Sequence, residues 1–184
     1  MRNLIYGSLV IIATGLLGGC GSSTKPAPSA APQADKAADK STDNKVFVMQ
    51  SGGVDVLKLT GPADFKCVAE DGSLKFDAPT FYAEYWLVAG AHTVDESLQR
   101  VGTVIESEFK NFKPSQTTDL TIAGSPAKRM VGDGEEADDG DPGQADVIVF
   151  KVGNHVFVAC NHGEKLTPVG QEGMLTLTQT AQAP

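Results

Sequence analysis

The chain has 184 residues, with 15 basic and 23 acidic side chains, a formal net charge of −8 and a pI near 4.8. This length accommodates one domain with terminal extensions. The sequence contains no cluster of lysine and arginine, which a nucleic-acid-binding surface needs to neutralise phosphates, so we predict no nucleic-acid partner.

Residues 1–19 are typical of a secretory signal peptide. They contain no acidic side chain, Arg2 lies in a short polar start, and an apolar stretch follows from Leu4 to Leu17. As a helix, these 14 residues would span about 21 Å, which is less than the roughly 30 Å of a bilayer's hydrocarbon core. The segment therefore predicts export rather than a membrane-spanning helix.

The end of this segment, Leu17-Gly18-Gly19-Cys20, resembles the lipobox of bacterial lipoproteins. The resemblance implies that the thiol of Cys20 receives a diacylglycerol, that cleavage occurs before Cys20, and that the freed amine is acylated. Several acyl chains at one position anchor a protein firmly, because each buried methylene contributes about 0.8 kcal/mol. Gly21 rather than Asp follows the cysteine, so the resemblance also implies the outer membrane of a Gram-negative cell, with the protein facing the periplasm.

Residues 20–44 are predicted to be the lipidated N-terminus and a flexible tether. From residue 21 onward this segment is rich in Ala, Ser and Pro and has no aromatic or branched aliphatic side chain. Burial therefore cannot offset the entropy lost on ordering it. We predict one folded domain over residues 45–184.

The first part of this domain reads as strands. Residues 46–60 fit either a hairpin about Ser51-Gly52-Gly53 or a short helix, and the pattern does not decide between them. Asp71-Gly72 separates the runs 64–70 and 73–77, a strong hairpin signal because such turns need positive φ angles. An aromatic-rich strand is expected over residues 80–88.

A long amphipathic helix is predicted over residues 93–112. Thr93 and Glu96 fit a capping box at its start, and Lys113-Pro114 follows its end. Apolar residues recur at spacings of three or four: Val94, Leu98, Val101, Ile105, Phe109 and Phe112. This spacing predicts that one face of the helix lies on a sheet.

Further strands are expected over residues 119–123 and 127–131, and a hairpin about Gly153-Asn154 joins 146–152 to 155–160. The runs on both sides of Gly153-Asn154 are almost continuously apolar, which predicts that both faces of the sheet are covered. The second cover is predicted to be a C-terminal helix that begins at Thr167 and Pro168, although Leu175 to Thr178 also alternate as in a strand.

These elements predict an α+β fold, an antiparallel sheet with helices on both faces in an α/β/α sandwich. Their order over residues 64–178 is similar to that of the PsbP-like group, and Gly124-Ser125-Pro126-Ala127 before a strand is the nearest local likeness. The resemblance implies a binding or assembly role and supplies no catalytic motif.

Cysteine usage predicts a disulfide. If Cys20 carries lipid, Cys67 and Cys160 remain, both in predicted strands and in a compartment that oxidises thiols. Two buried free thiols, or a reactive thiol, are the alternatives.

Cys160, His162 and Glu164 would share one face of an extended chain and offer a thiol, an imidazole and a carboxylate. They are the basis of an alternative function, a metal- or thiol-dependent enzyme. No paired Cys-x-x-Cys or His-x-x-x-His reinforces that interpretation. We therefore favour a strand end whose His162 and Glu164 pair at the surface.

The most unusual segment is acidic. Seven carboxylates occur within 14 positions without a basic residue: Asp133, Glu135, Glu136, Asp138, Asp139, Asp141 and Asp146. Their repulsion should extend a loop unless a cation, a basic partner or backbone donors neutralise them. The segment lacks the residue order of an EF-hand.

The sequence thus predicts a non-enzymatic, lipid-anchored binding or accessory module without a resident cofactor. Its candidate site for calcium or a basic protein partner comprises Glu135, Glu136, Asp138, Asp139, Asp141, His162 and Glu164.

Overall fold

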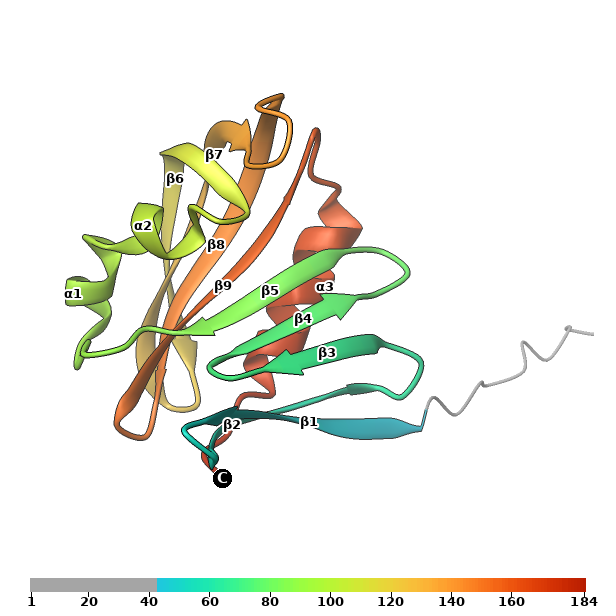
Figure 1. The fold of residues 1–184 in the computed structure, drawn as a ribbon, viewed down its shortest axis with the longest axis vertical. Coiled ribbons are helices and arrows are strands. Elements are labelled where there is room, and N and C mark those ends of the chain that lie inside the picture. The colour runs from blue at the N-terminus through green and yellow to red at the C-terminus, as the bar shows by residue number, and fades with distance from the viewer. Residues whose placement is uncertain (1–42) are drawn as a thin grey trace, which may run out of the picture. The chain divides into compact units, whose positions relative to one another are not determined.

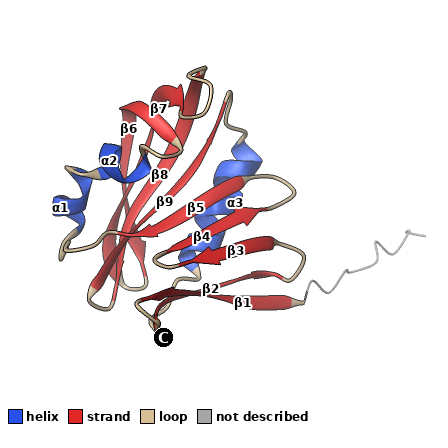
Figure 2. Ribbon diagram, in the orientation of Figure 1, coloured by secondary structure: helices blue, strands red, loops and turns tan. Residues whose placement is uncertain are grey.

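This computed structural model describes residues 43–184, so the predicted signal peptide, Cys20 and nearly all of the tether lie outside the described residues. Within residues 43–184 the chain forms nine strands and three short helices (Figure 2). They are β1 (Asn44–Ser51), β2 (Val54–Pro62), β3 (Lys66–Glu70), β4 (Ser73–Asp77), β5 (Tyr82–Leu87), α1 (Val94–Leu98), α2 (Val101–Ile105), β6 (Phe109–Ile122), β7 (Ser125–Glu136), β8 (Pro142–Val152), β9 (His155–Gly163) and α3 (Pro168–Gln179). No helix in this part of the chain is long and apolar enough to cross a bilayer.

Seven of these strands form one antiparallel sheet in the order β3-β4-β5-β9-β8-β7-β6 (Figure 1). The pairing of β5 with β9 joins the first half of the domain to the second, with Tyr85 opposite Ala159. Strands β1 and β2 form a separate hairpin. The end of β1 is joined to the β3–β4 turn by the Gly72 amide, which donates to the Gln50 carbonyl at 2.7 Å.

Both faces of the large sheet are buried, which explains the continuous apolar runs. In β8, Ile148 and Phe150 enter a first core, whereas Val147 and Val149 enter a second core on the opposite face. The first core lies under β1, β2 and α3, and the second lies under α1 and α2. Since the pleat sends successive side chains to opposite faces, a strand covered on both sides must be apolar throughout.

The predicted α/β/α sandwich is wrong. The described residues are mostly strand, and α1 and α2 have only five residues each. On the other face, the single helix α3 shares the cover with the β1–β2 hairpin, which settles residues 46–60 as a hairpin. The covering layers are therefore not two layers of helices.

The predicted helix over residues 93–112 begins as expected and then breaks. The capping box is confirmed, with the Glu96 amide 3.2 Å from Thr93 Oγ1 and the Thr93 amide 3.1 Å from Glu96 Oε2. However, α1 ends at Leu98, α2 is one further turn, and β6 already begins at Phe109.

The apolar spacing in this segment nevertheless identified the buried face, because Val101, Ile105 and Phe109 are all buried in the second core. The helix is interrupted at Gln99 and Arg100 and ends at Ile105. Gly102 and the β-branched residues of α2 have low helix propensity, so they do little to extend it. Residues from Phe109 onward gain backbone pairing with β7 instead.

The local hairpin and cap predictions are confirmed. Gly72 and Gly153 have φ angles of 77° and 58° in the turns β3–β4 and β8–β9. Helix α3 begins at Pro168, and the hydroxyl of Thr167 accepts a hydrogen bond from the Gly170 amide at 3.1 Å.

The structure does not support the predicted disulfide. Cys67 lies in β3 and Cys160 in β9, and both are free thiols. Two strands separate β3 from β9, which places them about 14 Å apart at the usual strand spacing, whereas a bridge needs Cα atoms about 4.4–6.8 Å apart. The two side chains also belong to different cores, on opposite faces of the sheet.

Candidate functional site

A cluster of polar side chains interrupts the second core at one end of the sheet. The sheet order brings together residues that are distant in sequence, because β4, β5, β9, β8 and β7 run side by side. The cluster consists of Lys75 from β4, Tyr82 and Glu84 from β5, Glu108 from the α2–β6 connection, Glu136 from β7 and His162 from β9.

His162 lies between two carboxylates. Its Nδ1 atom is 2.6 Å from Oε2 of Glu136, and its Nε2 atom is 3.9 Å from Oε2 of Glu108. The side chain is only 12% exposed. Within the described part of the chain, neither His162 Nε2 nor Glu136 Oε1 has a hydrogen-bond partner, although both atoms are buried.

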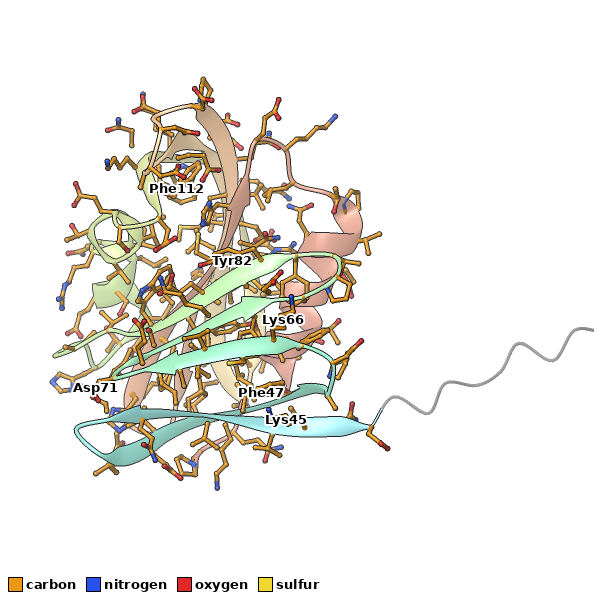
Figure 3. All side chains as sticks on the ribbon, turned by 45° about the vertical axis from the view of Figure 1, so that its right-hand side comes forward. Lys45, Phe47, Lys66, Asp71, Tyr82 and Phe112 are labelled. Carbon is orange, nitrogen blue, oxygen red and sulfur yellow. The ribbon has the colours of Figure 1, made fainter. Side chains whose placement is uncertain are left out.

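Two aromatic rings hold the imidazole in place. The ring of Tyr82, which Figure 3 shows on β5, meets it edge-on with centroids 5.6 Å apart, and the ring of Phe109 lies 6.0 Å away. Phe109 can lie there because β7 and β8 carry glycines beneath it. A Cβ atom on Gly134 would come within 2.3 Å of that ring, and one on Gly143 within 3.1 Å.

Lys75 neutralises the inner part of the cluster. Its Nζ atom is 3.1 Å from Glu84 Oε2 and 3.2 Å from Glu108 Oε1. Burial lowers the pKa of Lys75, but its bonds to these two carboxylates outweigh burial and raise that pKa overall.

Glu84 is the most deeply buried acid of the cluster, with 2% of the residue exposed. Burial raises its pKa to about 7, and the neighbouring Glu108 charge adds to that increase, while the bond to Lys75 opposes it. Burial, followed by the charges of Glu108 and Glu84, also raises the pKa of Tyr82. The cluster thus contains one lysine and three glutamates.

A cavity of about 470 Å³ opens above His162, between the β7–β8 turn and the end of β9. Its lining residues are Tyr82, Glu136, Asp138, Asp139, Asp141, Pro142, His162, Gly163 and Glu164. We call it the acidic cavity, because its lining contains five carboxylates and neither lysine nor arginine. Such a concave surface attracts cations.

The acidic cavity brings together six of the seven residues that the sequence nominated: Glu136, Asp138, Asp139, Asp141, His162 and Glu164. The seventh, Glu135, lies on the opposite face of β7, where it accepts a hydrogen bond from Asn111 Nδ2 at 2.9 Å. The imidazole of His162 contacts Glu136 rather than Glu164, which is exposed at the rim.

The acidic segment is a hairpin rather than an extended loop. β7 continues to Glu136 and β8 begins at Pro142. Backbone donors neutralise part of the turn's charge, since the Asp139 amide donates to Asp138 Oδ1 at 2.9 Å and the Asp141 amide to Asp139 Oδ1 at 3.0 Å.

The strand pleat also divides the acidic residues between the two faces. Asp146 is buried on the face opposite the acidic cavity. It accepts three hydrogen bonds from Arg129, at 2.9 and 3.2 Å from Nε and at 2.6 Å from Nη2. Burial raises the pKa of Asp146, and the Arg129 bonds oppose that increase. Asp146 therefore does not contribute to the cavity.

The thiol chemistry considered for Cys160 finds no support in this conformation. The side chain is fully buried, and burial raises the pKa of the thiol well above its ordinary value, with nearby carboxylates raising it further. A buried neutral thiol is a poor nucleophile. Among residues 43–184, no group of three or more His, Cys, Asp or Glu side chains is arranged to hold a metal ion.

The sequence did not reveal Lys75, Glu84 or Glu108 as members of the cluster. A usable signal was present in the strands, where Lys75 stands between Leu74 and Phe76 and Glu84 between Ala83 and Tyr85. A charged residue between core residues indicates a buried polar side chain on one face of a covered sheet. The strand order was needed to identify the partners of that side chain.

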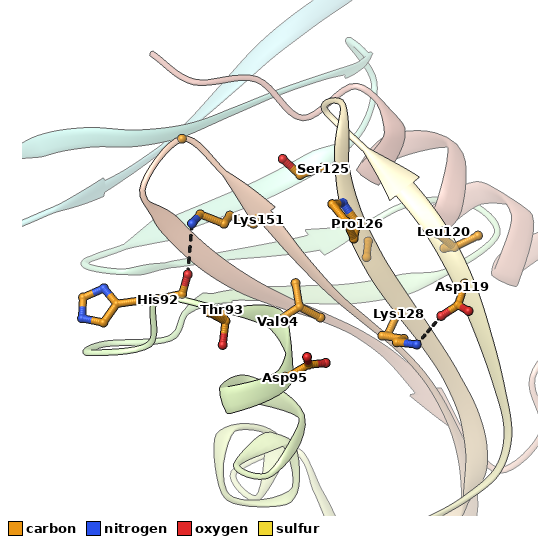
Figure 4. A pocket seen from close by; sticks show the side chains of 12 residues that line it. His92, Thr93, Val94, Asp95, Asp119, Leu120, Ser125, Pro126, Lys128 and Lys151 are labelled. Carbon is orange, nitrogen blue, oxygen red and sulfur yellow. Dashed lines mark hydrogen bonds and ion pairs between the residues drawn. The ribbon is translucent and has the colours of Figure 1, made fainter.

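A larger cavity of about 800 Å³ lies between α1 and the β6–β7 and β8–β9 turns (Figure 4). Both lysines in its lining are engaged. Lys151 donates to the His92 carbonyl at 3.0 Å, and Lys128 pairs with Asp119. This cavity has no excess charge comparable with that of the acidic cavity.

Comparisons with known proteins give a likeness of fold only. No protein-family model and no curated protein matches the chain. A solved structure of a protein from Bacteroides thetaiotaomicron VPI-5482 aligns with a TM-score of 0.51 at 14% identity, over 76% of this chain and 48% of that one. This chain therefore spans about half the length of that protein, and at such identity the match concerns the fold alone.

Two further solved structures align at lower scores. LpqN of Mycobacterium tuberculosis, described as involved in cell envelope biogenesis, has a TM-score of 0.43 at 14% identity, over 77% of this chain and 91% of its own. The cyanobacterial PsbP of Synechocystis sp. PCC 6803 has a TM-score of 0.44 at 9% identity, over 84% of this chain and all of its own. Both scores lie below 0.5, so neither establishes a shared fold.

Proposed function

We propose that this protein is a lipid-anchored, non-enzymatic accessory module that faces the periplasm and binds a basic segment of a partner protein in the acidic cavity. The lining of that cavity carries the binding proposal, with its five carboxylates and no lysine or arginine. The lipobox-like residues 17–20 support the anchor. A tether of 24 residues would give the domain a reach of about 25–30 Å.

The arrangement of the carboxylates fits lysine or arginine side chains on a protein. Asp138, Asp139 and Asp141 are exposed at the tip of the β7–β8 hairpin, where they can steer a basic segment from a distance. Deeper in the cavity, Oε1 of Glu136 is a buried acceptor without a partner in the described chain. Lys75, held between Glu84 and Glu108, shows within the same cluster how paired carboxylates bind an ammonium group.

Titration with a four-lysine peptide tests this proposal. The full-length protein in detergent should bind the peptide, and the triple variant Asp138→Asn, Asp139→Asn, Asp141→Asn should bind it at least tenfold more weakly, with a shallower dependence on salt. The matched control, Asp64→Asn, Glu70→Gln, Glu172→Gln, removes the same charge from exposed positions elsewhere and should bind as the wild type does.

Equal weakening by both triple variants would show a general charge effect and contradict a site at the hairpin. Calcium alone should be titrated in parallel. If the wild type binds calcium but not the peptide, and the hairpin variant loses the calcium, then the ligand of the site is a cation and not a protein.

The anchor has its own test. Cys20→Ala should move the protein from the membrane fraction to an uncleaved or soluble form, whereas Cys67→Ala should leave it in the membrane fraction. Unchanged membrane fractionation of the mature Cys20→Ala protein would contradict lipidation at this position.

A further inference from the structure

His162 joins two segments of the domain that are distant in sequence. Its Nδ1 atom faces Glu136 at the end of β7, and its Nε2 atom faces Glu108 in the connection between α2 and β6. We call the end of the β7–β8 hairpin, residues 135–142, the acidic hairpin. We propose that His162 is a proton-operated latch. It ties the acidic hairpin and the α2–β6 connection to β9 when the imidazole is protonated, and it loosens them when the imidazole is neutral.

The hydrogen-bonding capacity of the ring supports this difference. A neutral imidazole has a single N–H, and donating it to Glu136 leaves a lone pair on Nε2 facing the Glu108 carboxylate. Within the described residues, Nε2 is buried and has no partner. An imidazolium has two N–H groups, one for each carboxylate, and hydrogen bonds between charged groups are the stronger ones.

Charged and titratable groups surround the imidazole on every side. Glu84 and Tyr82 face the same pocket from β5, Lys75 from β4, Glu108 from the α2–β6 connection and Glu136 from β7. Cys160 lies on β9 itself, and Glu164 with the hairpin aspartates lines the opening. The pocket therefore holds one lysine and three glutamates, of which Glu84, with a pKa of about 7, is mostly neutral at about pH 5.5. Histidine is the side chain that ordinarily changes charge between about pH 5 and 8.

The two tied segments also meet through the backbone, which provides a local probe. The Ala137 amide donates to the Glu108 carbonyl at 3.0 Å, and Lys110 Nζ donates to the Ala137 carbonyl at 2.9 Å. Opening of the hairpin end away from the α2–β6 connection would break the first of these bonds. Hydrogen exchange at the Ala137 amide therefore reports whether the two segments that His162 bridges stay together.

The latch has a consequence for binding, and this consequence rests on the proposed function. Protonation of His162 adds one unit of positive charge to the cavity wall. The four-lysine peptide should then bind more weakly at low pH, and by reciprocity the bound peptide should disfavour the proton.

The test measures amide exchange in the full-length protein without any ligand. The measured quantity is a ratio: the protection factor of the Ala137 amide, corrected for intrinsic exchange, divided by that of the core amide of Ile148. In the wild type this ratio should rise about tenfold when the pH is lowered from about 7.5 to about 5.5. His155→Gln is the matched control, because His155 is exposed at the other end of β9, and it should respond as the wild type does.

In His162→Gln and in Glu108→Gln this ratio should change less than about twofold over the same range, because each variant removes one of the charges that form the latch. The second variant keeps the test decisive if the first does not fold. A wild-type pH response in a folded His162→Gln or Glu108→Gln protein would overturn the latch. Since no peptide is present, this outcome is independent of whether the acidic cavity binds a basic segment.

Discussion

The Nδ1 atom of His162 lies 2.6 Å from Oε2 of Glu136, although the two residues are 26 positions apart in the chain. This contact fixes the base of the acidic hairpin to the end of β9. It also places an ionisable ring at the wall of the acidic cavity, where both partners are largely buried. The same pair therefore contributes to the packing of the fold and to the wall of the cavity in which we propose that a partner binds.

The first prediction concerns this contact. His162→Ala should lower the free energy of unfolding by about 1–3 kcal/mol, because Glu136 would remain buried without a donor. Urea denaturation at neutral pH measures the change. Glu164→Ala, at the exposed rim, should stay within about 0.5 kcal/mol of the wild type. A similar loss in both variants would contradict a specific role for the buried pair.

The second prediction follows from the pKa of Glu84, which burial raises from 4.5 to about 7. Between these two pH values the folded protein keeps a proton that the unfolded chain has released. The stability linked to this carboxyl is thus complete below about pH 4.5 and is lost as the pH rises through about 7.

Urea unfolding should accordingly show the wild type more stable at about pH 5 than at about pH 7.5, by up to about 3 kcal/mol from this group. Glu84→Gln, which cannot ionise, should reduce that difference. Glu70→Gln, at an exposed position of β3, should leave it unchanged. An undiminished pH dependence in Glu84→Gln would show that another group carries it.

A third prediction tests the packing beneath the site. Gly134→Ala should destabilise the protein by about 1–3 kcal/mol, because the new Cβ atom would lie 2.3 Å from the Phe109 ring and 2.6 Å from the Lys110 carbonyl oxygen. Gly102→Ala is the matched control, since no atom outside its own turn of helix lies within 4 Å of its Cβ position, and alanine favours a helix. Thermal unfolding should therefore show a lower Tm than the wild type for Gly134→Ala and a higher Tm for Gly102→Ala.

The fourth prediction concerns the thiols. In denaturant without reductant, alkylation should label both Cys67 and Cys160, because they lie on different faces of the sheet and are not bridged. In the folded protein, Cys67 should react much faster than the fully buried Cys160. Peptide mass spectrometry assigns each label, and a mass for a linked pair of peptides would contradict the strand order.

Local signals in the chain were sufficient for the hairpins at Asp71-Gly72 and Gly153-Asn154 and for the cap at Thr93, because a turn or a cap depends on a few neighbouring residues. The long helix was predicted incorrectly because apolar residues at spacings of three or four mark a buried face, and both a helix and a sequence of two turns and a strand can bury it. Pairing of β6 with β7 decided between these arrangements.

Composition and order along the chain indicated an acidic protein whose last strands are buried on both faces and whose carboxylates are concentrated in residues 133–146. Only the tertiary structure decided which of them share a surface. The pleat of β7 sends Glu135 and Glu136 to opposite faces, and the sheet order sets Lys75, Glu84 and His162 side by side. Such contacts depend on strand pairing across the whole domain, which no short stretch of sequence encodes.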